Sequence, residues 1–297
     1  MKNMEELDIW IKTPPLEERE TSFKYVGKSR FDKDTTRLIS EKFKAPYNSR
    51  IMTPHIIQYG EGGLKVDVGE CLFSEHQILN KTKEVPNGRM KALEQRAFPM
   101  AVMCLTLTSD NRIVFSRRNF KYTHARGKIT LSPGGYVDVA LDSDNGLVRP
   151  TLTARREYKE EFGAEESTIR RLNMHGMTFS NGNNFGCSLS YKLETGLTFQ
   201  ELKAHYDKSH DFETKEILEI EFSRDSIRRF IRLNLEEMSN HALGTCLLVG
   251  RNEFGEEWYE EILKELQKKW KIIEAPNGFF SGKSDVNETI RALHQAD

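Results

Sequence analysis

The chain has 297 residues, enough for one large domain or two modest ones, and 30% of them are charged, as in an ordinary soluble globular protein. The 44 basic and 45 acidic residues give a formal net charge of −1, so the chain as a whole has no electrostatic attraction to nucleic acid or an anionic membrane. The four cysteines lie far apart in sequence, which excludes a CxxC redox site and a zinc knuckle.

Residues 1–95 are predicted to form a separate α+β portion. Residues 31–44 carry apolar side chains at helical spacing and end before a proline. Two short β-rich runs, 51–59 and 64–68, flank a glycine-rich turn. The charged stretch 81–96 is either a linker or an exposed helix. The sequence does not assign a function to this portion; by analogy alone, we expect it to pack against the rest of the chain and form one wall of a pocket.

From residue 96 onward, strands and helices alternate, which predicts a layered α/β domain over 96–297. The clearest helix has Pro150 at its start and Gly163 directly after its end, the positions that these residues favour. Strands are expected at 100–108, 112–117, 129–131 and 217–222, and on both sides of a turn at 180–184. Helices are expected at 151–162, 197–206, 223–233 and 256–270.

The helix at 151–162 carries three acids on one face. Glu157, Glu160 and Glu161 stand at i, i+3 and i+4. Their like charges repel, and a hard divalent cation would relieve that repulsion because Mg²⁺ prefers carboxylate oxygens and water. Arg156 lies one turn before Glu160, where its guanidinium can hold a carboxylate. Taken alone, the pattern also fits a solvated acidic helix face.

Two neighbouring features favour a binding site over a plain surface. A Pro-Gly-Gly turn that includes Gly134 and Gly135 precedes the helix, so a backbone carbonyl can lie beside the acids. The strand pair before this turn ends in Arg117 and Arg118, and arginine binds phosphate groups well. Because neighbouring residues of a strand face opposite sides, only one of these arginines is expected to reach the site.

The segment 156–163, together with the turn 132–137, resembles the Nudix box of the Nudix hydrolase family. The family pattern is Gly-x5-Glu-x7-Arg-Glu-U-x-Glu-Glu-x-Gly-U, where U is aliphatic. The resemblance runs over about 100–250, and it implies a Nudix-type α/β/α sandwich to which the N-terminal α+β portion is added. The residues that match the box are Arg156, Glu157, Glu160, Glu161 and Gly163.

The chain departs from the family pattern at one position. Six residues after Gly135 the family has a glutamate, and this chain has Leu141. An insertion at about 141–147 stretches the spacing, and Asp138 or Asp142 is the candidate replacement. The departure leaves open how many metal ions bind and whether the site has reduced activity or none.

The resemblance implies a metal site on the acidic face of the helix. Glu160 and Glu161 would bind Mg²⁺, or Mn²⁺ in its place, with the carbonyl oxygen of Gly134 completing the set. Glu157 would bind the metal or orient the attacking water. The chemistry implied is substitution at phosphorus, where most of the catalysis is charge neutralisation and positioning.

Nudix enzymes often bring a further glutamate from a loop late in the domain. The resemblance favours Glu213 for this role, with Glu216 as the alternative, and either could equally be a surface acid. Arg117 or Arg118 would bind the diphosphate of the substrate, next to Gly135.

Segments 197–206, 211–214 and 240–246 are similar to a Nudix subgroup that cleaves UDP-glucose-type substrates. The sequence therefore predicts a Mg²⁺-dependent hydrolase of the diphosphate bond in a nucleotide sugar. ADP-ribose or a dinucleotide is the alternative substrate. A nucleotide-binding sensor of the same fold, without turnover, is the alternative from a different class.

The expected partner is a small nucleotide, and no basic stripe with interleaved aromatics indicates nucleic-acid binding. Trp258, Ile262, Leu266 and Trp270 lie at helical spacing, which predicts a core face, with a homodimer face as the alternative. The N-terminal segment has no basic start and apolar run, and no stretch is long enough to span a bilayer, so a cytoplasmic protein is expected.

Overall fold

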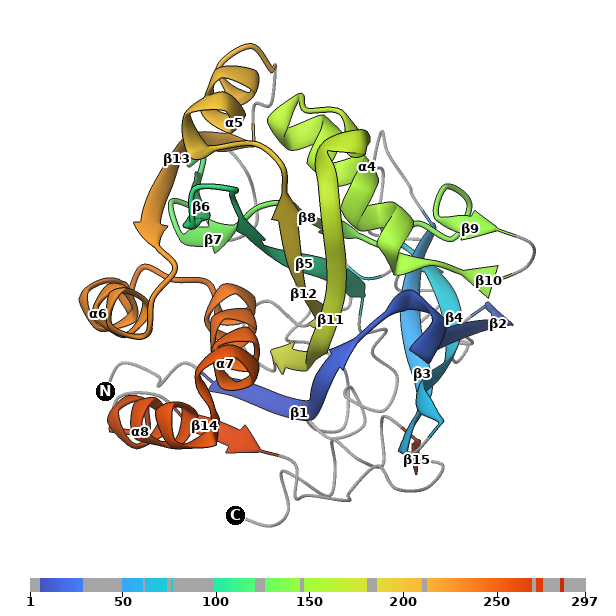
Figure 1. Cartoon of the computed structure of the whole chain (residues 1–297). Coiled ribbons are helices and arrows are strands. Elements are labelled where there is room, and N and C mark those ends of the chain that lie inside the picture. Colours follow the sequence, from blue (N-terminus) through green and yellow to red (C-terminus); the bar gives the residue numbers. More distant parts are fainter. Residues whose placement is uncertain are drawn as a thin grey trace.

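The structure is a computed structural model with two β-sheets, the larger of which is covered by helices (Figure 1). The helix expected at 31–44, the stretch 81–96 and the turn after residue 180 lie outside the described residues. The described residues are 6–28, 50–60, 62–73, 76, 99–120, 126–144, 147–180, 186–209, 213–268, 271–274 and 284–285.

Within these residues, the larger sheet has nine strands in the order β13-β6-β5-β12-β11-β1-β14, with β7 beside β6 and β8 beside β5. The strands expected at 100–108, 112–117, 129–131 and 217–222, and those around residue 180, are all confirmed. The strands of this sheet are β1 (Glu6–Leu16), β5 (Met100–Leu107), β6 (Arg112–Arg118), β7 (Ile129–Leu131), β8 (Gly134–Tyr136), β11 (Ile169–Ser180), β12 (Gly186–Thr195), β13 (Thr214–Glu221) and β14 (Lys271–Glu274).

Strand β5 changes its partner along its length. Its first half pairs with β8, where Met103 lies opposite Gly134, and its last residues pair with β6, where Leu107 lies opposite Ile113. Residues 115–117 of β6 pair with β7 instead. The glycine turn of β8 and the arginine end of β6 are therefore held by separate strand pairs of one sheet.

The smaller sheet joins strands from two distant parts of the chain. Its order is β15-β3-β4-β2-β10-β9. The insertion expected at about 141–147 lies next to the N-terminal strands, because β10 pairs with β2 and β9 with β10. The boundary expected at residue 95 does not separate the two sheets, because β1 precedes it and belongs to the larger sheet. The strands here are β2 (Thr21–Lys28), β3 (Arg50–Gly60), β4 (Gly63–Leu72), β9 (Ser143–Asp144), β10 (Leu147–Val148) and β15 (Ser284–Asp285).

Helices cover both faces of the larger sheet, so the mixed α/β fold expected from the sequence is confirmed. Val102 and Cys104 of β5 pack with α4 and α5, whereas Leu105 on the other face packs with α6, α7 and α8. No described helix is both long and apolar enough to cross a membrane. The helices are α4 (Pro150–Phe162), α5 (Phe199–Tyr206), α6 (Arg224–Asn234), α7 (Asn240–Phe254) and α8 (Glu256–Leu266), with short 3-10 turns at Glu18–Glu20 and Glu166–Thr168.

Gly250 of α7 lets α8 pack closely. A Cβ at Gly250 would lie 2.2 Å from the ring of Trp258, which is fully buried. Gly250→Ala is therefore expected to lower the free energy of unfolding by about 1–3 kcal/mol, because overpacking outweighs the gain in helix propensity. Urea unfolding measures this effect. Gly60→Ala is the control, since nothing lies within 4 Å of its added Cβ. Equal midpoints for the two variants would contradict the packing argument.

Candidate functional site

Helix α4 is fixed by its ends and by its buried face. Pro150 occupies its first turn, and Gly163 ends it in the left-handed conformation with φ 66°. Ala154, Tyr158 and Phe162 are fully buried against the sheet. The face with the expected metal ligands is thereby directed toward β8.

Two of the three acids contact the Gly-Gly turn directly. A Cβ at Gly135 would lie 2.1 Å from Oε1 of Glu157, so the carboxylate of Glu157 packs where only glycine leaves room. The N–H of Gly134 donates to Oε1 of Glu161 at 2.8 Å. The turn and the helix are therefore joined through the acids themselves.

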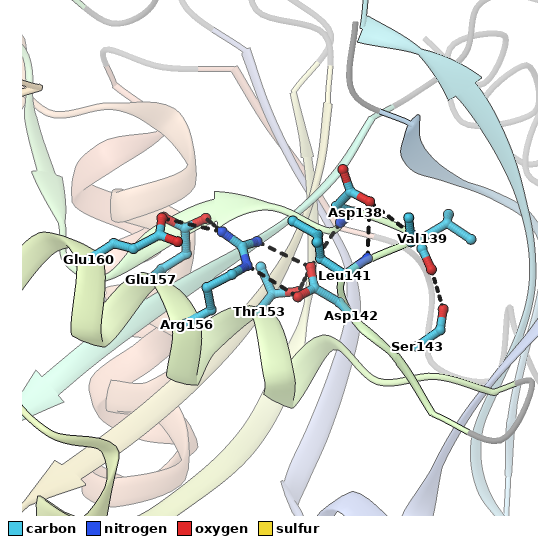
Figure 2. A network of polar contacts seen from close by, with 10 residues as sticks. Asp138, Val139, Leu141, Asp142, Ser143, Thr153, Arg156, Glu157 and Glu160 are labelled. Atoms are coloured by element: carbon cyan, nitrogen blue, oxygen red, sulfur yellow. Dashed lines mark hydrogen bonds and ion pairs between the residues drawn. The ribbon is translucent and has the colours of Figure 1, made fainter. Parts of the chain in front are cut away.

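Arg156 lies between the acids of α4 and a buried aspartate (Figure 2). Its Nη1 donates to Glu157 Oε1 at 2.7 Å and lies 3.4 Å from Glu160 Oε2. Its other edge binds both carboxylate oxygens of Asp142, at 3.3 and 3.2 Å. This two-point contact fixes the plane of the guanidinium and aims its remaining donor at the acids.

Asp142 is itself held by several donors. Its side chain is 1% exposed, and its Oδ2 accepts from Thr153 Oγ1 at 2.7 Å and from the N–H of Asp138 at 2.9 Å. Asp138 instead accepts from the N–H groups of Ala140 and Leu141, within its own loop. Of the two aspartates proposed from the sequence, Asp142 is therefore the one that reaches Arg156.

The smaller sheet supports this loop through what we call the β3 junction, the backbone contacts of 50–52 with 137–139. The N–H of Met52 donates to the carbonyl of Val137, and the N–H of Val139 donates to the carbonyl of Arg50, both at 3.0 Å. Neither the junction nor the role of Thr153 was expected from the sequence. The partners in the junction are distant in the chain, and no local pattern marks the contact of Thr153 with Asp142.

Burial raises the pKa of the Glu157 carboxyl to about 7. Arg156 lowers this pKa, while the charges of Glu160 and Glu213 raise it further. The Glu157 side chain is 15% exposed, so water screens these effects only in part. A carboxylate with this pKa can accept a proton near neutral pH.

The raised pKa makes the metal-free protein less stable as pH increases. The folded state binds the Glu157 proton more tightly than the unfolded chain, so the stabilisation is complete below pH 4.5 and is lost as pH rises through 7. In the absence of metal, the free energy of unfolding of Glu157→Gln relative to that of the wild type is therefore expected to rise by up to about 3 kcal/mol as the pH increases from 4 to 8. Urea unfolding in EDTA at several pH values measures the difference, and a difference that does not change with pH would contradict this assignment.

The two arginines at the end of β6 have different partners. Arg117 binds Glu216 at 3.2 Å and Glu237 at 2.7 Å. Arg118 binds Glu213 at 2.8 Å, and Glu213 is close enough to Glu157 to raise its pKa. The structure therefore brings Arg118 and Glu213 toward the acids of α4, and ties Arg117 and Glu216 to each other.

Tyr136 follows the Gly-Gly turn and packs into an aromatic cluster. Its ring centroid lies 5.7 Å from that of Phe73 and 6.2 Å from that of His76. Burial raises the pKa of Tyr136 to about 12. These contacts support the packing role that the sequence favoured over base stacking.

The donor chemistry of the site fits Mg²⁺. Among the described residues, no group of three or more histidine, cysteine, aspartate or glutamate side chains gathers closely enough to bind a metal ion. Mg²⁺ usually keeps several waters, however, and binds one or two protein carboxylates together with substrate phosphates. The repulsion among Glu157, Glu160 and Glu213 is the environment that a cation relieves.

No family model matches the chain, and no curated protein matches it. Among solved structures, the chain is similar to a protein from Deinococcus radiodurans, with 16% identity over 55% of this chain and 85% of that one, and a TM-score of 0.35. The MutT protein from Methanosarcina mazei Go1 has 15% identity, coverage of 56% and 93%, and a TM-score of 0.32. The Nudix hydrolase RenU from M. smegmatis has 11% identity, coverage of 57% and 84%, and a TM-score of 0.33. Likenesses of this size transfer no activity to the chain, so function has to be inferred from the site.

Proposed function

We propose that the protein is a Mg²⁺-dependent hydrolase of the diphosphate bond in a nucleoside diphosphate linked to another group. The observation that carries this proposal is the contact of the partly buried Glu157 carboxylate with Gly135, on the helix face that also bears Glu160 and Glu161. The similarity of the sequence to the Nudix box supports the reaction type. A nucleotide sugar such as UDP-glucose is the substrate that the sequence favours.

Each residue has a distinct part in this proposal. Glu160 and Glu161, with the carbonyl of Gly134, would hold Mg²⁺ together with waters and substrate phosphates, and Mg²⁺ would neutralise charge on the diphosphate. The Glu157 carboxylate would orient the attacking water and accept its proton.

The basic groups of the site act on the substrate and on the acids separately. Arg118 binds phosphate oxygens from the β6 side, where it now contacts Glu213. Arg156 holds the carboxylates of Glu157 and Glu160 in place from the other side. The phosphate chain would therefore lie between β6 and α4.

A nucleotide-binding sensor is the second candidate function. Two observations favour it: the absence of three gathered metal-ligating side chains among the described residues, and Leu141 at the position of the family's glutamate. Against it, the charges of Glu160 and Glu213 lie close enough to Glu157 to disfavour its ionised form, and a binding site without metal does not require this repulsion.

Product analysis tests the substrate class. UDP-glucose, ADP-ribose, NADH and a dinucleoside polyphosphate are each incubated with the protein and Mg²⁺, and the products are separated by ion-exchange chromatography. The proposal expects UMP and glucose 1-phosphate from UDP-glucose, and no products when EDTA replaces Mg²⁺. Cleavage of only ADP-ribose, or of only a dinucleotide, would identify that class as the substrate in place of the nucleotide sugar. Equal cleavage in EDTA would contradict the metal requirement.

A further inference from the structure

A small cavity, which we call the β11 cavity, lies on the face of the larger sheet where α7 packs across β1, β11 and β12 (Figure 1). Leu172 and Met174 of β11 pack on the opposite face, with α4, so residues 171 and 173 point toward α7. The cavity is open, with an empty volume of about 240 Å³, and none of its lining residues belongs to the proposed hydrolase site. Its polar lining residues are Arg171, Asn173, His175, Lys192, Glu194 and Glu253.

His175 is the extra residue of a β-bulge. In the pairing of β11 with β12, Met174 lies opposite Tyr191 and Gly176 lies opposite Ser190, so no residue of β12 lies opposite His175. Bulges redirect a side chain, and they are frequent next to functional sites. His175 is only 1% exposed, yet it lines the cavity. The bulge therefore places a buried imidazole in the cavity wall.

The hydrogen bonds of Asn252 determine which ring nitrogen of His175 carries the proton. Nδ2 of Asn252 donates to the carbonyl of Thr13 at 2.8 Å, which fixes the orientation of the amide because a carbonyl only accepts. The same nitrogen lies 2.9 Å from Nδ1 of His175, so Nδ1 is an acceptor and the hydrogen of the neutral ring is on Nε2. Among the described residues none accepts from Nε2, which leaves this donor for a ligand.

The charges that act on the His175 ring are positive. Burial, followed by the charges of Lys192 and Arg171, lowers the pKa of His175 to about 3, so the ring is neutral at pH 7. Asn173 orients Arg171: with its amide turned to satisfy both ends, the side-chain oxygen accepts from Nε and Nη2 at 3.2 and 3.1 Å. An anion bound at Nε2 of His175 would be attracted by both cations.

We propose that the β11 cavity binds a small oxyanion, a carboxylate or a phosphate, which accepts from Nε2 of His175 and pairs with Arg171 and Lys192. Arginine and lysine bind such groups through charge-assisted hydrogen bonds. Pockets for drug-sized ligands measure about 300–1,000 Å³, so this smaller cavity fits an ion or a short acid and not a whole nucleotide. The inference does not depend on the proposed hydrolysis, because the two sites share no residue.

A cation fits the β11 cavity less well than an anion does. Its two carboxylates, Glu194 and Glu253, both bind Nζ of Lys192, at 3.0 and 2.8 Å. The same ammonium lies 5.2 Å from the centre of the Phe222 ring. The acids therefore hold Lys192 in the cavity wall, and a further cation would be repelled by Lys192 and Arg171.

NMR of the protein with ¹⁵N-labelled histidine side chains tests the proposal at His175 itself. The His175 resonances, assigned with His175→Gln, are expected to show a neutral ring protonated on Nε2 at pH 7. They should move as inorganic phosphate or acetate is added in EDTA. Arg171→Gln is expected to weaken this binding about tenfold, because it removes a charge-assisted contact. Arg170→Gln is the matched control, since Arg170 precedes Arg171 on β11 and does not line the cavity.

The outcomes separate the β11 cavity from the proposed hydrolase site. A His175 response to phosphate alone supports the proposal and identifies a phosphate site, and a response to acetate alone supports it and identifies a carboxylate site. No response to either anion would overturn it, as would equal affinities of Arg171→Gln and Arg170→Gln. Phosphate binding that is lost in Arg118→Gln and unchanged in Arg171→Gln would also overturn it, in favour of the hydrolase site. A His175 response in a protein without hydrolysis would support the cavity and contradict the hydrolase.

Discussion

Glu157→Gln is expected to lower kcat at least about 100-fold at saturating Mg²⁺, with a small effect on KM. The change keeps the size of the side chain against Gly135 but removes the charge and the ability to accept a proton. General base catalysis alone is worth about 10²–10⁴-fold in rate. Steady-state kinetics on the substrate identified by product analysis measures the effect.

Glu165→Gln is the matched control for this prediction. Glu165 follows α4, is exposed, and pairs with Lys159 on the surface, so its loss should leave kcat within about twofold. The stability of Glu157→Gln separates catalysis from folding, because the metal-free variant is expected to gain stability relative to wild type at pH 8. A variant that retains wild-type kcat would contradict the assignment of Glu157.

Asp142→Ala is expected to lower the free energy of unfolding by about 3 kcal/mol or more. It leaves the guanidinium of Arg156, which is 26% exposed, without its two-point partner. It also removes the acceptor for Thr153 and for the N–H of Asp138. Because Arg156 then no longer fixes Glu157 and Glu160, kcat should fall as well. Urea unfolding and steady-state kinetics, both carried out below the midpoint temperature of the variant, measure the two effects.

Asp144→Ala is the comparison for Asp142→Ala, because Asp144 lies two residues on and binds Arg149 at an exposed position. It should change the free energy of unfolding by less than about 1 kcal/mol. Asp142→Asn keeps an acceptor for Thr153 and is expected to fall between the two. If Asp142→Ala were as stable as Asp144→Ala, Asp142 would not be the anchor of Arg156.

Helix α4 was predictable from sequence because its signals are local. Pro150, Gly163 and the spacing of the three acids lie within one segment, and α4 begins and ends where these residues indicate. Arg117 and Arg118 are neighbours in β6, so strand geometry also predicts that their side chains lie on opposite faces of the sheet. Which arginine faces the acids was not predictable, because Arg117 is held by Glu237, a partner far along the chain.

The strands expected at 51–59 and 64–68 are confirmed as β3 and β4, but the sequence did not predict helix α7 or the pairing of β10 with β2 in the smaller sheet. Residues 242–250 of α7 are all buried, so the helix shows no polar face from which a period of 3.6 could be recognised. The strands β9 and β10 have two residues each, and they form because β10 pairs with β2 and β9 pairs with β10. Long-range pairing of this kind leaves no pattern in a single sequence.

Simultaneous measurement of nucleotide binding and hydrolysis tests the central claim most directly. Wild-type protein is titrated with the nucleotide sugar, once with Mg²⁺ and once with EDTA, while release of the nucleoside monophosphate is followed in the same sample. We expect release that depends on Mg²⁺ and is lost in Glu157→Gln. Tight binding in both conditions with no release in either would contradict the hydrolase and establish a nucleotide-binding protein instead.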